Sequence, residues 1–102
     1  MFDTAAVLDR DPAPTFDTPS HPGRLRCRIE GARDPNLLSR IVGELCRRSC
    51  VPEHLESAPV PGDPEAQWVT LSVTLSGAQE AAHLAARFAS WPVVRTVQRL
   101  EG

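Results

Sequence analysis

Apolar residues recur at helical spacing between residues 34 and 48. One face of a helix with this sequence would carry Leu37, Leu38, Ile41, Val42 and Leu45. Asp34 can cap the first turn with its carboxylate, and Pro35 then stands where no backbone N–H is needed. The polar side would carry Arg40, Glu44, Arg47 and Arg48. The pattern predicts one amphipathic helix that lies on a sheet.

Two segments alternate strictly between apolar and polar residues, which is the period of a strand with one buried face. In residues 24–30 the apolar positions are Leu25, Cys27 and Ile29. In residues 67–75 the apolar positions are Val69, Leu71, Val73 and Leu75. The opposite faces carry three arginines in the first segment and Trp68 in the second, and we expect both to point away from the core.

The remaining segments give weaker signals. Residues 53–60 are a possible strand, in which Pro59 is tolerated only at a sheet edge or a strand end, and residues 61–64 have the composition of a turn. Ser76 and Gln79 have the spacing of a capping box, which predicts a second helix that ends before Pro92. Its inward residues would be Ala81, Ala82, Leu84, Ala85 and Phe88. Residues 93–100 would form a last strand.

The order strand, helix, strand, strand, helix, strand predicts an α+β fold of the ferredoxin-like, split βαβ (βαββαβ) type. In this fold, two helices cover one face of a four-stranded antiparallel sheet, and the other face here would be polar. Residues 24–102 would form this domain. Residues 1–23 are rich in Pro, Asp and Thr without a sustained period, and we expect a flexible N-terminal tail.

Length and charge narrow the class of protein. A chain of 102 residues is enough for one domain with one modest core. All eleven basic residues are Arg, and the net charge is −2, so residues 24–102 are close to neutral and make a poor general nucleic-acid binder. No run approaches the roughly 18 apolar residues of a membrane span, and no secretory signal is visible. We therefore expect a cytoplasmic protein that binds neither nucleic acid nor membranes.

The sequence contains no recognisable catalytic motif. It has no nucleophile elbow, glycine-rich phosphate loop or paired-carboxylate motif, and the histidines are expected to be solvated: His21, His54 and His83. Cys46, Cys50 and His54 have a spacing that could be imagined as a metal site, but zinc spacings are usually tighter and a fourth ligand is lacking. We interpret the cysteines as reduced thiols, with Cys27 and Cys46 as small core residues and Cys50 at a helix end. No metal and no cofactor are expected.

The run LLSRIVGELCRR (37–48), preceded by the loop residues 33–36, resembles the first helix of an ACT domain. Within this run, Leu-Ser-Arg-Ile-Val-Gly at 38–43 is similar to the regulatory (small) subunit of acetolactate synthase in its short form. In the last predicted strand, residues 91–96 resemble the run with which that family ends. The resemblance covers residues 24–100. Asn36, Ser49 and Val51 stand where the family has Gly, Gly and Asn.

This resemblance implies a non-catalytic protein that docks on the catalytic subunit of acetolactate synthase and regulates it allosterically. It further implies a homodimer formed through the edges of the second strands, with a branched-chain amino acid such as valine bound between protomers. Carried over by position, the effector site consists of Arg33, Asp34, Asn36, Leu37 and Leu38, which face Val51 and Pro52 of the other chain. Thiamine diphosphate, FAD and Mg²⁺ would belong to the catalytic partner.

Two other functions fit the same fold. A free-standing ACT-like amino-acid sensor or dimerisation module would need no enzyme partner. An RNA-binding split βαβ module would present several stacked aromatic side chains on its central strands, and only Trp68 is available for that role. The sequence therefore disfavours RNA binding and leaves the regulatory subunit and the free-standing sensor open.

Overall fold

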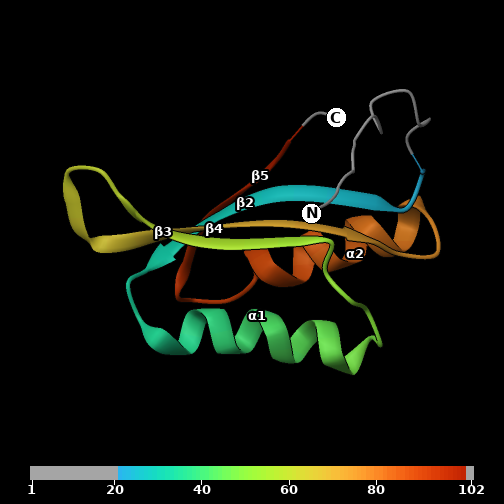
Figure 1. Cartoon of the computed structure of the whole chain (residues 1–102), viewed down its shortest axis with the longest axis horizontal. Helices are drawn as coiled ribbons and strands as arrows, with labels where there is room; N and C mark the ends of the chain where they lie inside the picture. Colours follow the sequence, from blue (N-terminus) through green and yellow to red (C-terminus); the bar gives the residue numbers. More distant parts are fainter. Residues whose placement is uncertain (1–20, 101–102) are drawn as a thin grey trace, which may run out of the picture.

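A computed structural model describes residues 21–100 (Figure 1). The elements are β2 (Arg24–Ala32), α1 (Pro35–Arg47), β3 (His54–Val60), β4 (Asp63–Thr74), α2 (Ala78–Ala89) and β5 (Val94–Arg99). All strands pair antiparallel in the order β3-β4-β2-β5, and both helices cover one face of the sheet. The predicted ferredoxin-like fold is therefore confirmed. Most of the predicted tail, residues 1–20, lies outside the described residues.

The core lies between the sheet and the two helices. Most of its strand residues are the apolar positions of the two alternating segments, and β5 adds Val94. Residues that are opposite each other in paired strands point to the same face of the sheet, as Leu25 and Val73 do. The helices contribute large side chains that are at most 1 % exposed: Leu37, Ile41, Leu45, Leu84 and Phe88. Trp91, just after α2, packs edge-on against Phe88 with ring centroids 5.3 Å apart. One apolar layer therefore holds the domain together.

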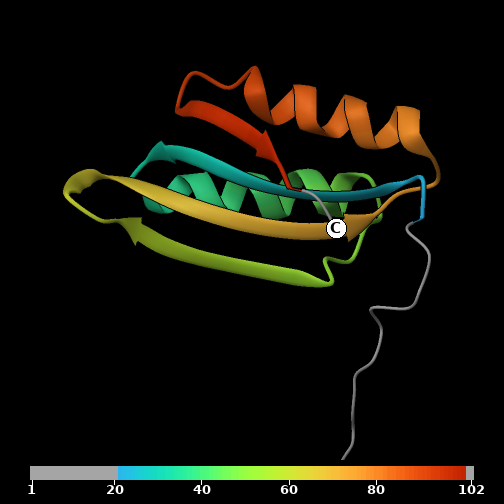
Figure 2. The same cartoon turned by 90° about the horizontal axis from the view of Figure 1, so that it is seen from above.

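The two edge strands are β3 and β5, which lie along opposite sides of the sheet (Figure 2). Pro59 lies near the end of the edge strand β3, where a missing backbone donor is tolerated. The turn between β3 and β4 is shorter than predicted, because Asp63 already pairs with Val60 and β4 begins there. Gly62 adopts a φ of 79° in this turn, a conformation that favours glycine.

Gly31 allows β2 to pass close to the segment that leads into β5. A Cβ atom at this position would lie 2.6 Å from the carbonyl oxygen of Val93 and 2.9 Å from Cδ2 of Leu37. The pairing of β2 with β5 shifts register between Glu30 and Gly31. The first strand continues past the glycine to Ala32, two residues beyond the alternating segment 24–30.

Helix α1 begins as predicted, with Asp34 as N-cap and Pro35 in the first turn. Its outward face is not the predicted one, since Glu44 is buried at 4 % exposure while Val42 is 38 % exposed and Cys46 is exposed. The helix is rotated toward α2, which places Glu44 between the helices and turns Val42 and Cys46 to solvent. Cys46 as a core residue and Glu44 as a surface residue were therefore wrong predictions.

The capping box predicted for the second helix is absent. Helix α2 has Gly77 as its N-cap with no side-chain hydrogen bond, and Ser76 is exposed outside the helix. Ala82, predicted to point inward, is exposed because the buried stripe of α2 is narrower and consists of Ala81, Leu84 and Phe88. Neither helix in residues 21–100 is long and apolar enough to cross a membrane.

Candidate functional site

The loop between β2 and α1 carries most of the predicted effector site. Asp34 has an extended backbone, with φ −130° and ψ 128°, and its carboxylate Oδ1 accepts a hydrogen bond from the backbone N–H of Asn36 at 2.9 Å. The N–H of Leu37 donates to the carbonyl of Asp34 at 2.9 Å. The protein's own carboxylate therefore occupies the first turn of the helix, whose free backbone N–H groups could otherwise bind the carboxylate of a ligand.

Long-range hydrogen bonds fix this loop to the sheet. The side-chain amide of Gln67, on β4, donates to the carbonyls of Ala32 at 3.2 Å and of Asp34 at 3.1 Å. The N–H of Arg33 donates to the carbonyl of Glu65 at 2.9 Å. Gln67 was absent from the predicted site, because nothing local in the sequence signals a contact across 33 to 35 positions. It is the residue that holds the loop in place.

Arg33 and Asp34 present opposite charges side by side on the fixed loop. Arg33 is exposed, and its guanidinium makes no hydrogen bond or ion pair with the rest of the described chain. Within the same part of the chain, the carboxylate of Asp34 has the Asn36 N–H as its one partner. A cation next to a carboxylate is complementary to a zwitterion, which carries the reverse pair of charges. The loop therefore presents both signs of charge that the two polar ends of an amino acid would need.

The other predicted site residues divide into three groups. Leu37 is 1 % exposed and belongs to the core, whereas Leu38 is half-buried and Asn36 is exposed beside the loop. Val51 and Pro52 follow the far end of α1, about 20 Å away along a helix of 13 residues. One chain therefore brings the loop residues together but not Val51 or Pro52. Val51 is 82 % exposed, which leaves its apolar side chain available to a second molecule.

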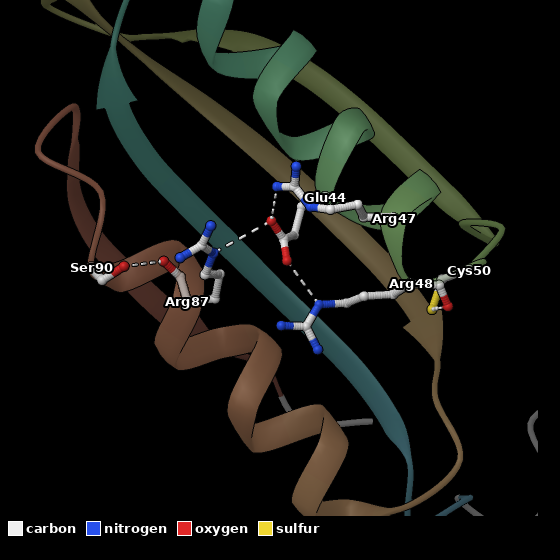
Figure 3. A network of polar contacts seen from close by, with 6 residues as sticks. All are labelled: Glu44, Arg47, Arg48, Cys50, Arg87 and Ser90. Carbon is white, nitrogen blue, oxygen red and sulfur yellow. Dashed lines mark hydrogen bonds and ion pairs between the residues drawn. The ribbon is translucent and has the colours of Figure 1, made fainter.

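A second polar centre, which the sequence did not predict, joins the two helices (Figure 3). The carboxylate of Glu44 accepts hydrogen bonds from Nη2 of Arg47 at 2.7 Å and from Nε of Arg48 at 2.9 Å. Arg47 is the last residue of α1, and Arg48 is its C-cap. Arg87 reaches the carboxylate from α2, with its Nε 3.4 Å from Oε1 of Glu44. Hydrogen bonding to Arg47, helped by Arg48 and Arg87 and opposed by burial, lowers the pKa of Glu44 to about 2. Glu44 is therefore a charged link between the helices at neutral pH.

The open face of the sheet is polar, as predicted. The guanidinium carbon of Arg28 lies 4.7 Å from the ring centroid of Trp68 across the two central strands. The buried Nε atoms of Arg24 and Arg28 have no hydrogen-bond partner among the described residues. Arg28 covers Trp68, so that the indole face that a stacked base would need is already taken.

Thiols and histidines form no cluster in the described part of the chain. Residues 21–100 contain no group of three or more His, Cys, Asp or Glu side chains that could hold a metal ion. Cys46 is exposed and Cys50 is half-buried, and Cys50 Sγ contacts the carbonyl oxygen of Arg48 at 3.5 Å. Burial raises the pKa of the Cys27 thiol to about 11, although Arg99 lowers it in part. Cys27 is therefore a neutral core residue.

Comparison with known proteins places the fold and no more. No family model and no curated protein matches the sequence. Among solved structures, the chain is similar to the crystal structure of the ACT domain from GTP pyrophosphokinase of Chlorobium tepidum, with a TM-score of 0.61 at 17 % identity. The alignment covers 76 % of this chain and 96 % of that domain. Its solution structure matches 78 % of this chain and 86 % of its own, with a TM-score of 0.61 at 16 % identity.

A further match is the C-terminal domain of the MgtC protein from Mycobacterium tuberculosis. It covers 78 % of this chain and 86 % of its own, with a TM-score of 0.58 at 14 % identity. Identities this low establish a shared fold and leave activity and ligand open. Residues 21–100 therefore have the ferredoxin-like fold that is seen in ACT domains.

Proposed function

We propose that this protein is a non-catalytic, ACT-like regulatory subunit that binds an amino acid, and that its partner is the catalytic subunit of acetolactate synthase. The observation that carries the ligand-binding proposal is the pair formed by the exposed Arg33 and the half-buried Asp34, on a loop fixed by Gln67. A loop backbone that is fixed before a ligand arrives loses little entropy when the ligand binds. The choice of acetolactate synthase comes from the resemblance of residues 37–48.

In this proposal the ligand is a branched-chain amino acid such as valine. Arg33 receives its carboxylate, and the carboxylate of Asp34 receives its ammonium group. This arrangement differs from binding at bare helix N–H groups, because Asp34 already occupies the Asn36 N–H. The exposed Val51 and the adjacent Pro52 of a second copy supply the apolar cover for the side chain.

A homodimer is the second part of the proposal. Because β3 is an edge strand, the backbone groups on its outer side have no strand partner within the described residues. Pairing of β3 with its own copy about a two-fold axis continues the sheet and gives an interface that is the same from both sides. Each protomer then contributes Val51 and Pro52 to a site on the other.

The regulatory effect follows from linkage. Docking of the dimer on the catalytic subunit shifts that enzyme between states of different activity. An amino acid that binds one docked arrangement better than another shifts the same equilibrium. Catalysis and its cofactors remain with the partner.

The test is the rate of acetolactate formation by the catalytic subunit from the same genome, with and without this protein and with valine added to each. We expect the protein to change the rate and valine to alter that change. Arg33→Gln should remove the valine effect and keep the effect of the protein itself, whereas Arg99→Gln, the same change at an exposed arginine of β5, should keep both. An unchanged rate in every sample would refute the regulatory-subunit proposal.

A free-standing sensor is the alternative that such a result would favour. Thermal unfolding with a panel of amino acids then identifies the ligand, because a ligand at 100 times its dissociation constant adds about 2.7 kcal/mol to the free energy of unfolding. Arg33→Gln should remove that gain. If no amino acid stabilises the protein, the ligand-binding part of the proposal is wrong as well.

A further inference from the structure

A groove of about 340 Å³ lies on the helical side of the molecule, and no residue of the β2–α1 loop lines it. It is lined by Ser39, Arg40, Gly43, Arg47, Arg87 and Trp91. The first four belong to α1, Arg87 belongs to α2, and Trp91 follows α2. Its volume lies within the range of pockets that bind small molecules.

Three arginines line this groove: Arg40, Arg47 and Arg87. The buried Glu44 forms ion pairs with Arg47 and Arg87 and so restricts their side chains. Its Oε1 holds Nη2 of Arg47 at 2.7 Å and Nε of Arg87 at 3.4 Å. The side chains of Arg47 and Arg87 nevertheless remain 68 % and 50 % exposed. Each guanidinium has five N–H donors, so donors are left over for a ligand.

Arg40 is positioned independently of that network. Its guanidinium carbon lies 5.3 Å from the ring centroid of Trp91, which is itself 7 % exposed. Stacking on a buried indole restricts the long side chain and keeps its charge at the groove. Arg40 makes no ion pair with Glu44 or with any other described residue.

The balance of charge in the groove is strongly positive. Among the described residues, Glu44 is the one acid that contacts the groove arginines, and it also pairs with Arg48. Arg47, Arg48 and Arg87 therefore share one carboxylate, and Arg40 adds a further positive charge without an acidic partner among the described residues, on a chain whose net charge is −2. By contrast, Arg95 elsewhere on the surface faces two acids, Asp63 and Glu30. A cluster of excess cations on an acidic protein indicates an anionic ligand.

Gly43 supplies an independent observation. A glycine in a helix is less stable than alanine, and nothing lies within 4 Å of the Cβ atom that another residue would place here. The described residues therefore give no packing reason for a glycine at this position. What the glycine does is leave the backbone of α1 bare at the wall of the groove, between Arg40 and Arg47.

From this arrangement we propose that the groove between α1 and α2 binds a small polyanion with adjacent phosphoryl groups, of the diphosphate class. A guanidinium group can donate two parallel hydrogen bonds to phosphoryl oxygens. Several arginines around one small site therefore match a ligand with adjacent phosphoryl groups better than a ligand with a single carboxylate. An acidic protein segment fits less well, because the groove offers no exposed apolar anchor and Trp91 is buried. This site is separate from the proposed amino-acid site.

The test uses the full chain, with inorganic pyrophosphate as the probe and isothermal titration calorimetry as the measurement. We expect saturable binding that weakens as salt is raised and that exceeds the affinity for sulfate at least tenfold. Arg40→Gln should weaken binding at least tenfold, and it leaves the Glu44 network intact. Arg99→Gln makes the same change of charge elsewhere and should leave the affinity unchanged.

Gly43→Gln separates a ligand site from a structural role. It places a neutral side chain in the groove, where the fold has room, so the variant should unfold at the same or a higher temperature and yet lose pyrophosphate binding. Arg33→Gln should have no effect on pyrophosphate. Equal affinities of the parent protein, Arg40→Gln and Gly43→Gln would overturn the proposal, as would binding of an acidic peptide without binding of pyrophosphate.

Discussion

The charge state of Glu44 depends on the residues that surround it. The residue is 4 % exposed, and burial is strongly unfavourable for a charge without partners. Arg47 and Arg48 lie three and four positions further along the same helix, so that two of the three partners are local. The third, Arg87, comes from α2 and makes the carboxylate a tie between the helices. Losing the charge should therefore lower the stability of the whole domain.

Glu44→Gln should lower the free energy of unfolding at pH 7 by about 2 kcal/mol, less than the full pKa shift implies because the arginines are partly solvated. The folded pKa, about 2, lies below the ordinary value of 4.5, so the contribution of the charge is present above pH 4.5 and is lost as pH falls toward 2. Urea unfolding between pH 7 and pH 2.5 should show the parent protein approaching the variant.

A matched control for this change is Glu56→Gln, at a side chain of β3 that is 64 % exposed. It should alter the free energy of unfolding by less than about 0.5 kcal/mol, as surface substitutions usually do. A difference between Glu44→Gln and the parent that stays constant from pH 7 to pH 2.5 would contradict the assignment of the charged form.

At the scale of elements, the two edges of the sheet differ in what they offer to a partner. β5 spans six residues and lies next to α2, whereas β3 spans seven residues and forms the outer side of a long hairpin with β4. Long edge strands readily pair with other chains unless something covers them. β3 is therefore the edge at which we expect the second copy.

Ser57 lies at the middle of β3, so a two-fold axis near the centre of that strand would place it opposite its own copy. Ser57→Glu and Ser57→Arg should each weaken the dimer at least tenfold, because like charges then face each other. An equimolar mixture of the two variants should restore a dimer through opposite charges. Sedimentation equilibrium of each variant and of the mixture measures this.

The same substitutions at Thr96, an exposed residue of β5, provide the control, since the opposite edge should not respond. Dimers of unchanged stability in both Ser57 variants would exclude pairing through the middle of β3. Weaker dimers in the Thr96 variants would instead indicate that β5 is the interface.

At the scale of the whole molecule, the fold has one core on one side of the sheet. Cys27 lies in the central strand β2 at 0 % exposure, and its pKa is raised to about 11 by burial. A thiol in this state is neither accessible nor ionised at neutral pH, and the thiolate is the reactive form. Its reactivity should therefore report opening of the whole domain.

With Cys46 and Cys50 replaced by Ser, Cys27 should react with a thiol reagent at pH 8 only as fast as the domain unfolds. Its rate should rise with urea in parallel with the unfolded fraction. In the parent protein, the exposed Cys46 should react at once in the folded state. Rapid labelling of Cys27 without denaturant would show that β2 opens locally and that the core is not one cooperative unit.

The sequence by itself determined the local structure of this protein. The period of apolar residues identified both helices and the two central strands, and Asp34 with Pro35 marked the start of α1 to the residue. These features are set by residues within four positions of one another, so that the sequence alone is enough to predict them. The order of elements then left few topologies, and the ferredoxin-like fold is one of them.

Only the tertiary structure decided how those elements meet. The rotation of α1 toward α2 buried Glu44 and exposed Cys46, and the pairing with β3 extended β4 back to Asp63. The hydrogen bonds from Gln67 to the β2–α1 loop likewise join residues that are far apart in sequence. The same holds for the groove between the helices. A local pattern fixes which face of a helix is apolar, but which edge of that face meets a neighbour depends on how the whole core packs.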